Sequence, residues 1–144
     1  MPAWVEAGVD EYSRRLPREL QLDWRTQALG RRGKNVKTVD VVAQESDRLV
    51  QALKPQDHVV LLDVDGKAWD SPTLAEQLAG WQQSGQDVAL VIGGPDGVDA
   101  QLKQASHQQW SLSPLTLPHP LVRVLLAEQL YRAWTVLQGH PYHK

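Results

Sequence analysis

The sequence has 144 residues, of which 42% are hydrophobic and 22% charged, and its formal net charge is −2. A chain of this length builds one ordinary domain, and we expect residues 1–144 to form a single domain. The absence of cysteine excludes disulfide frameworks, thiol catalysis and iron–sulfur clusters. No apolar stretch reaches the ~20 residues of a membrane span, and without a signal-peptide pattern we expect a cytoplasmic protein.

The positive charge is concentrated near the start of the chain. Residues 1–37 hold eight Lys or Arg against five Asp or Glu, whereas residues 38–144 hold seven against twelve. A basic segment of this kind either tracks phosphates or is a solvated surface, and the charge count alone favours the solvated surface. The nearly even overall balance argues against a protein that binds nucleic acid by bulk attraction.

Helices and strands alternate in the first part of the sequence. Apolar residues at three- and four-residue spacing predict a helix over residues 3–16, and alternation predicts a half-buried strand over residues 20–28. A basic loop with two glycines follows at residues 30–37, and helical spacing returns at residues 39–53. The run VVLLD at residues 59–63 predicts a strand of a parallel sheet that is covered on both faces.

The second part continues this alternation. A turn, DVDGKAWD, is expected at residues 63–70, and Ser71 as N-cap with Pro72 at the first helical position opens a helix that ends near Gly85. The remaining predicted elements are a strand over residues 87–92, a short helix near 99–108, a strand over 110–113 and a long helix from about 121 to 137. The pattern therefore predicts an α/β domain with a mostly parallel sheet flanked by helices.

Three loops follow the predicted strands and are candidates for a ligand site. IGGPDG at residues 92–97 is neither a dinucleotide fingerprint nor a phosphate loop, and a plain glycine turn is an equally good interpretation. The second loop follows VVLLD and contains a glycine. The third spans residues 113–120, is rich in proline and carries no charge apart from His119. Such loops suit a flat adenine and a sulfonium group better than a triphosphate.

Several polar side chains near the C-terminus are open to two interpretations. His119 lies between two prolines and is either a positioned acid, base or donor, or a structural histidine. Glu128 and Arg132 have the spacing of a helix salt bridge worth ~0.3–0.5 kcal/mol. The ending HPYHK is either a frayed tail or a contact segment. No metal site is expected there, because no acidic residue is close in the sequence to the two tail histidines.

Taken together, four strings indicate a family. VVLLDVDGKAWDSPTLAEQL, LVIGGPDGV, WSLSPLTLPHPLVRVLLAEQLYRAW and HPYHK resemble the ribosomal RNA large-subunit methyltransferase H family of the SPOUT class, and the resemblance covers essentially the whole chain. It implies an α/β fold with a deep C-terminal trefoil knot, a homodimer and an S-adenosylmethionine site. It also implies methyl transfer to N3 of a pseudouridine of 23S rRNA in the large subunit or assembled ribosome.

The resemblance also implies roles for individual residues. On the substrate side His119 and Tyr142 fit positioning or proton handling, Arg132 fits electrostatic stabilisation, and His143 fits substrate binding. Arg31, Arg32 and Lys34 of the basic loop are our candidates for phosphate contacts. The family's cofactor contacts match Leu62, Gly93, Gly94, Leu112, Ser113, Pro114, Leu115, Thr116 and Leu117.

One departure from the family pattern concerns the start of the sequence. Members usually open with a strand that ends in a glycine-lysine turn, before the segment that matches residues 2–5. Here Met1 stands where that strand has already ended. We expect either an upstream start, or a sheet that lacks a strand and exposes an edge.

Two alternatives to an enzyme of this family are considered. One is a non-catalytic ribosome-binding or assembly factor that keeps the fold, and cofactor binding distinguishes it. The other is a flavodoxin-like or dinucleotide-binding domain, which the missing glycine fingerprint and missing acidic ribose ligand disfavour.

Overall fold

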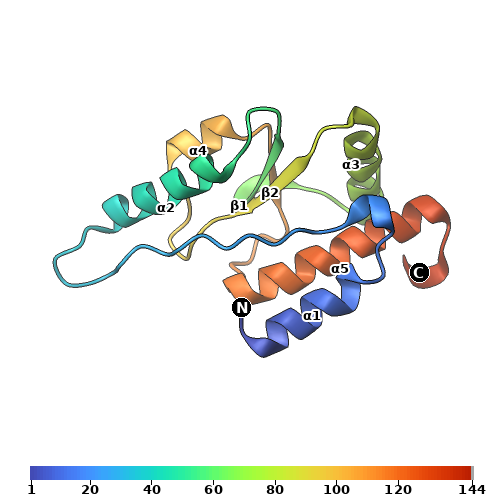
Figure 1. The fold of residues 1–144 in the computed structure, drawn as a ribbon, viewed down its shortest axis with the longest axis horizontal. Coiled ribbons are helices and arrows are strands. Elements are labelled where there is room, and N and C mark those ends of the chain that lie inside the picture. The colour runs from blue at the N-terminus through green and yellow to red at the C-terminus, as the bar shows by residue number, and fades with distance from the viewer. Residues whose placement is uncertain (144) are drawn as a thin grey trace. The chain divides into compact units, whose positions relative to one another are not determined.

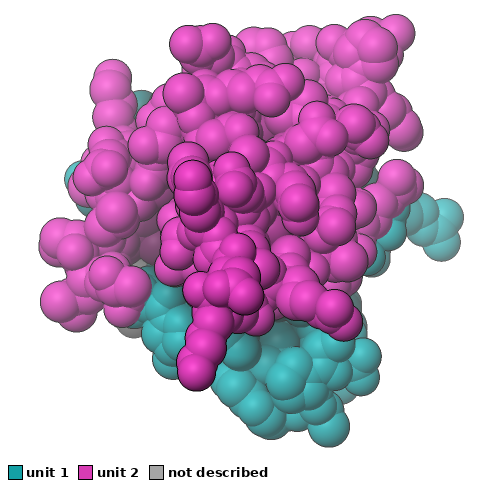
Figure 2. Space-filling view, turned by 90° about the vertical axis from the view of Figure 1, so that its left-hand side faces the viewer, with its two compact units in different colours: residues 1–24, 69–85, 117–144 teal, residues 25–68, 86–116 magenta. Residues whose placement is uncertain are grey.

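The computed structural model describes residues 1–143 and has the predicted α/β class (Figure 1). The chain divides into two compact units, which Figure 2 colours separately. Unit 1 comprises residues 1–24, 69–85 and 117–144, and unit 2 comprises residues 25–68 and 86–116. The expectation of a single domain stays a prediction.

Unit 2 contains the parallel sheet, as the buried runs predict. Its strands are β1 (His58–Ala68), β2 (Val88–Ile92) and β3 (Gln108–Ser111), in the order β2-β1-β3 with both pairings parallel. Helices α2 (Thr38–Ala52) and α4 (Ala100–Ala105) contact each other beside it (Figure 1). The core of this unit consists of Val59, Leu61, Val91 and Leu102, with Leu49, Val50, Leu53 and Val98 against it.

Strand β1 is longer than predicted, and the turn expected at residues 63–70 is wrong. The strand continues to Ala68, and its register with β3 shifts, so that both Leu62 and Lys67 lie beside Trp110. Gly66 lies inside this irregularity. A Cβ atom on Gly66 would lie 2.6 Å from the carbonyl carbon of Gln109. The glycine that suggested a turn therefore allows one backbone to approach another closely.

Unit 1 consists of helices. They are α1 (Ala3–Ser13), α3 (Ser71–Ser84) and α5 (His119–Gln138), with short 3₁₀ turns at Arg18–Leu20 and Pro141–His143. Helix α5 contacts both α1 and α3, and α1 lies alongside it (Figure 1). The buried residues at the α1–α5 contact are Val5, Val9 and Ala127, with Tyr12, Leu22, Trp24 and Val124 against them.

The strand predicted over residues 20–28 is wrong. Leu20 belongs to a 3₁₀ turn, and residues 21–28 form no strand. The alternation still reflects burial, because Leu22 and Trp24 are half-buried against the α1–α5 core while Asp23 and Arg25 are exposed. An extended segment becomes a strand only beside a partner strand, and the sheet described here has none next to it.

Several helix and strand boundaries also differ from prediction, and α1 ends at Ser13 and α4 at Ala105, each three residues early. The N-cap of α3 is Asp70 and not Ser71, because the Asp70 carboxylate accepts the Thr73 N–H at 2.8 Å. Helix α5 begins at His119, two residues early, since Pro120 suits a first turn. β3 spans 108–111 and not 110–113. Within the described residues no helix has the length and apolarity needed to cross a membrane.

Candidate functional site

The carboxyl edge of the sheet brings together the predicted cofactor residues of unit 2. The register places Leu62 beside both Ile92 and Trp110. Gly93 follows Ile92 directly, and Leu112 comes two residues after Trp110. In parallel sheets ligands bind beyond this edge. The residues brought to it are Leu62, Gly93, Gly94, Leu112, Ser113, Pro114, Leu115 and Thr116, whereas Leu117 belongs to unit 1.

The loop of residues 93–97 has a tight shape. Its Gly97 N–H donates to the Gly94 carbonyl oxygen at 3.1 Å, and Gly97 has a φ of 85°, which favours glycine. A Cβ atom on Gly93 would lie 2.5 Å from Cγ1 of Val98, and one on Gly94 would lie 2.7 Å from Oε1 of Glu45. A side chain at Gly93 would therefore force Val98 to shift, and one at Gly94 would force the end of the Glu45 side chain to shift.

The loop after β3 is shaped by its own serines. The Ser111 hydroxyl donates to the Ser113 carbonyl oxygen at 3.0 Å, and the Ser113 hydroxyl oxygen accepts the Leu115 N–H at 2.9 Å. Pro114, Leu115 and Thr116 are exposed, and 71% of the Leu115 surface is accessible. This loop offers an apolar side chain and backbone polar groups next to the sheet edge.

Asp63 provides a test of whether this edge fits a nucleoside cofactor. Its Oδ2 atom is buried and has no hydrogen-bond donor within the described part of the chain, although Lys103 Nζ lies 3.6 Å away. A buried acceptor without a donor is costly, and a ribose hydroxyl would satisfy it. The donor that Asp63 Oδ2 lacks is one that the ribose of an adenosine-type group carries.

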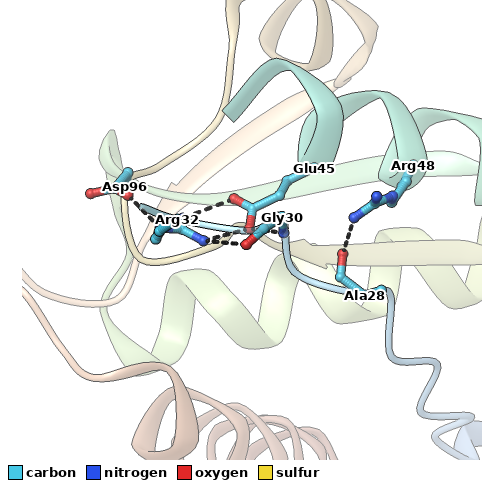
Figure 3. Close-up of polar contacts among 6 residues, drawn as sticks. All are labelled: Ala28, Gly30, Arg32, Glu45, Arg48 and Asp96. Atoms are coloured by element: carbon cyan, nitrogen blue, oxygen red, sulfur yellow. Dashed lines mark hydrogen bonds and ion pairs between the residues drawn. The ribbon is translucent and has the colours of Figure 1, made fainter. Parts of the chain in front are cut away.

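Of the three basic residues predicted to bind phosphate, Arg32 forms hydrogen bonds with other residues of unit 2 (Figure 3). Its two terminal nitrogens donate to the Glu45 carboxylate at 3.0 and 3.1 Å, and its Nε donates to Asp96 at 3.0 Å. Glu45 is 4% exposed, and the hydrogen bonds from Arg32 lower the pKa of its carboxyl group. Arg31 and Lys34 are exposed.

In unit 1, Arg132 and Tyr142 meet at the carboxylate of Glu128. Arg132 Nε donates to Glu128 Oε1 at 2.9 Å, which confirms the predicted salt bridge, and the Tyr142 hydroxyl donates to the same oxygen at 3.1 Å. The Arg132 guanidinium also lies over the Tyr142 ring, 5.1 Å from its centroid. Burial and the neighbouring Glu128 charge raise the pKa of Tyr142 to about 12. The phenol is therefore protonated at neutral pH.

The C-terminal segment is held against α5. The His140 N–H donates to the Thr135 carbonyl oxygen at 2.9 Å, and His140 Nδ1 accepts the Tyr142 N–H at 3.1 Å. The Tyr142 ring meets Tyr131 edge-on, with centroids 4.7 Å apart. The interpretation as a contact segment fits these bonds better than a frayed tail. The side chain of His143 lies outside the described part of the chain, and His119 is the half-buried first residue of α5.

A model of the family described as "Predicted SPOUT methyltransferase" matches residues 1–143. The chain belongs to this family. It is 56% identical over 144 residues to "Ribosomal RNA large subunit methyltransferase H" of Hahella chejuensis (strain KCTC 2396), a match that covers all of this chain and 92% of the relative. Proteins of the same name from Chromohalobacter salexigens and Methylococcus capsulatus are 52% and 51% identical, each with 93% of the relative covered. The resemblance seen in the sequence is confirmed.

Four acidic residues of this SPOUT methyltransferase escaped the sequence prediction of its site. Glu45 carries no sequence signal, and Asp63 and Asp96 lie in predicted ligand segments without a pattern that marks them, because acidic residues usually face water. Glu128 does carry one, since its spacing from Arg132 places the two on one helix face. Within residues 1–143 no group of three or more His, Asp or Glu could hold a metal ion.

Proposed function

We propose that this chain is an S-adenosylmethionine-dependent methyltransferase that modifies N3 of a pseudouridine of 23S rRNA in the large subunit or assembled ribosome. The observation that carries the proposal is the 56% identity, along its whole length, to a relative named as a large-subunit rRNA methyltransferase. The deep C-terminal trefoil knot, the homodimer and the cytoplasmic location belong to the same proposal. Membership of the SPOUT family supports them.

The cofactor is assigned to the carboxyl edge of the unit 2 sheet. Leu62, Gly93, Gly94 and residues 112–116 would hold S-adenosylmethionine, with Asp63 Oδ2 as the acceptor for a ribose hydroxyl. S-adenosylmethionine supplies a methyl group that is already electrophilic. What remains for the protein is to orient the target nitrogen and to manage its proton.

The Glu128 cluster is assigned to the substrate side. Arg132 carries a positive charge, and its hydrogen bond to Glu128 raises its pKa further. A cation there stabilises negative charge on the imide nitrogen of the target base. Tyr142 is protonated at neutral pH, so it acts as a hydrogen-bond donor and not as a base. His119 remains the candidate for moving the proton, and the side chain of His143 the candidate for a further substrate contact.

The alternative is a non-catalytic ribosome-binding or assembly factor with the same fold. The relatives' names favour catalysis over this alternative. Titration calorimetry with S-adenosylmethionine separates them, because a factor that has lost its chemistry has no need of the cofactor. Binding of a nicotinamide or flavin instead would favour the dinucleotide-binding alternative.

The decisive experiment maps methylated nucleotides by mass spectrometry. Ribosomal particles from a strain that lacks this gene are incubated with the purified chain and S-adenosylmethionine, and free 23S rRNA serves as the competing substrate. We expect a single added methyl group on a pseudouridine in particles and much less in free RNA, because the chain has no large excess of positive charge. Absence of any added methyl group would overturn the proposal.

A matched pair of variants ties that activity to the proposed site. Arg132→Ala removes the cation of the Glu128 cluster, and we expect methylation to fall about a hundredfold. Arg123→Ala removes an arginine from the same helix outside that cluster and should retain activity. Equal losses in both variants would show that α5 charge in general, and not the cluster, supports the reaction.

A further inference from the structure

Three segments of unit 2 meet at the carboxylate of Glu45 (Figure 3). From the basic segment, the Gly30 N–H donates to Glu45 Oε2 at 2.8 Å and Arg32 forms two hydrogen bonds with the same carboxylate. From the loop of residues 93–97, Gly94 lies so close that a Cβ atom would be 2.7 Å from Glu45 Oε1. Asp96 of that loop accepts a hydrogen bond from Arg32 Nε at 3.0 Å. Glu45 itself belongs to α2.

We propose that Arg32 and Glu45 are positioning residues that fix the loop of residues 93–97 and couple it to the basic segment of residues 28–34. Cofactor bound at the loop and RNA bound at the basic segment then raise each other's affinity. This inference rests on the proposed function, which assigns the loop to the cofactor and the segment to RNA. It also removes Arg32 from the set of phosphate ligands.

The bonding of Arg32 explains why it does not serve RNA. Its Nε and both terminal nitrogens already donate to Asp96, Glu45 and the Gly30 carbonyl oxygen. A phosphate that withdrew this guanidinium would take from the buried Glu45 carboxylate both hydrogen bonds of its ion-pair partner, which is unfavourable. The exposed Arg31 and Lys34 carry no such penalty.

The same contacts explain the coupling. The loop lies against Glu45 at Gly94 and is hydrogen-bonded to Arg32 at Asp96, and Arg32 also donates to the Gly30 carbonyl oxygen. Arg31 lies between these two anchored residues, so its backbone position depends on the network. A ligand that holds the loop therefore also holds the basic segment, and thermodynamic linkage makes the effect reciprocal.

Three variants test the proposal. Arg32→Lys keeps the charge but loses the planar fork, and Asp96→Asn weakens the bond to the loop at a residue that is 42% exposed, so its fold is not at risk. Arg48→Gln is the control, because Arg48 lies on the same helix and donates to Ala28 of the same segment at 2.8 Å without touching the loop. Cofactor affinity is measured by calorimetry on the purified chain, with and without ribosomal particles.

We expect Arg32→Lys and Asp96→Asn to weaken S-adenosylmethionine binding about tenfold, with Arg48→Gln within about twofold of the parent chain. Ribosomal particles should tighten cofactor binding to the parent chain and to Arg48→Gln, but not to Arg32→Lys. At saturating cofactor the turnover of Asp96→Asn should recover, since the defect lies in KM and not in kcat.

Two results would overturn the inference. One is unchanged cofactor affinity in both Arg32→Lys and Asp96→Asn. The other is a loss of particle binding in Arg32→Lys at full cofactor affinity, which would make Arg32 a phosphate ligand after all. If the parent chain binds no S-adenosylmethionine, the proposed function fails first. Faster amide hydrogen exchange in residues 94–97 of Arg32→Lys than of Arg48→Gln would still support the positioning role.

Discussion

Two glutamates of this protein each pair with an arginine but differ in their other partners. Glu45 of unit 2 and Glu128 of unit 1 each lie on a helix and each accept two hydrogen bonds from an arginine. Glu45 also binds the Gly30 N–H and lies against Gly94, so it fixes main chain. Glu128 binds the Tyr142 hydroxyl and the Gln129 amide, so it orients side chains.

The difference separates a structural carboxylate, which we call the frame and which consists of Glu45 and its partners, from a carboxylate of the candidate site, Glu128. A carboxylate that holds main chain sets the shape of loops, and its removal is expected to lower the free energy of unfolding. A carboxylate that aligns a cation and a phenol sets the geometry of functional groups, and its removal is expected to be felt as rate. The two glutamates can therefore be told apart by the quantity that each variant changes.

The largest expected effect is on catalysis. Glu128→Gln keeps the shape of the side chain but removes the charge that orients Arg132 and Tyr142, and we expect methyl transfer to slow about a hundredfold. Single-turnover methylation of ribosomal particles at saturating cofactor measures it. Arg123→Ala, on the same helix but outside the Glu128 cluster, is the control. A rate within twofold of the parent chain would make Glu128 a plain salt-bridge residue.

The next effect is on stability, where we expect the loss of Glu45 to matter more than the loss of Glu128. Glu45→Ala leaves the Gly30 N–H and Arg32 without their acceptor, and we expect the free energy of unfolding to fall by about 2 kcal/mol. Glu128→Ala should cost less, about 1 kcal/mol, because it leaves no main-chain N–H without its acceptor and because Glu128 is 12% exposed against 4% for Glu45. Urea denaturation measures both. A larger loss in Glu128→Ala would remove the distinction between frame and site.

The pH dependence of stability sharpens the comparison, because the Glu45 cluster loses its stabilisation at low pH and the Glu128 cluster loses its stabilisation at high pH. The lowered pKa of Glu45 means that its stabilisation is present above the ordinary glutamate pKa and is lost as pH falls through the lower folded value. The raised pKa of Tyr142, about 12, means that its stabilisation is present below the ordinary tyrosine value of 10.0 and is lost as pH rises toward 12.

Melting temperatures of Glu45→Gln and Tyr142→Phe across pH provide the measurement. Glu45→Gln should melt below the parent chain at pH 7 and approach it on acidification. Tyr142→Phe should melt below the parent chain up to pH 10 and approach it above. Differences that do not change with pH would contradict both assignments.

The sequence predicted the elements better than the contacts between them. The buried runs at residues 59–63 and 87–92 gave a parallel sheet because a strand covered on both faces must be apolar throughout. The strand over residues 20–28 was wrong because alternation reports burial and not pairing. Trp24 and Leu22 are buried on one side without any ladder.

For the site, sequence reasoning located segments but not partners. The strand order and register that place Leu62 beside Ile92 and Trp110 depend on long-range pairing, which no local pattern encodes. Arg32 was grouped with Arg31 and Lys34 by charge alone, although its partners Glu45 and Asp96 lie 13 and 64 positions away in sequence. The knot, the dimer and the cofactor contacts remain predictions.

The smallest expected effect concerns the two exposed cations of the basic segment. If Arg31 and Lys34 each contact one phosphate, Arg31→Ala and Lys34→Ala should each lower the slope of log affinity against log salt by about 1 for ribosomal particles, with cofactor affinity unchanged. Binding measured over a roughly fourfold range of salt concentration, from about 50 to about 200 mM, resolves a change of this size. Lys54→Ala removes an exposed cation of unit 2 outside the basic segment and should leave the slope as it is. Slopes equal to that of the parent chain in all three variants would mean that the basic segment is a solvated surface. Arg32 would then be held there only by its contacts with Glu45 and Asp96.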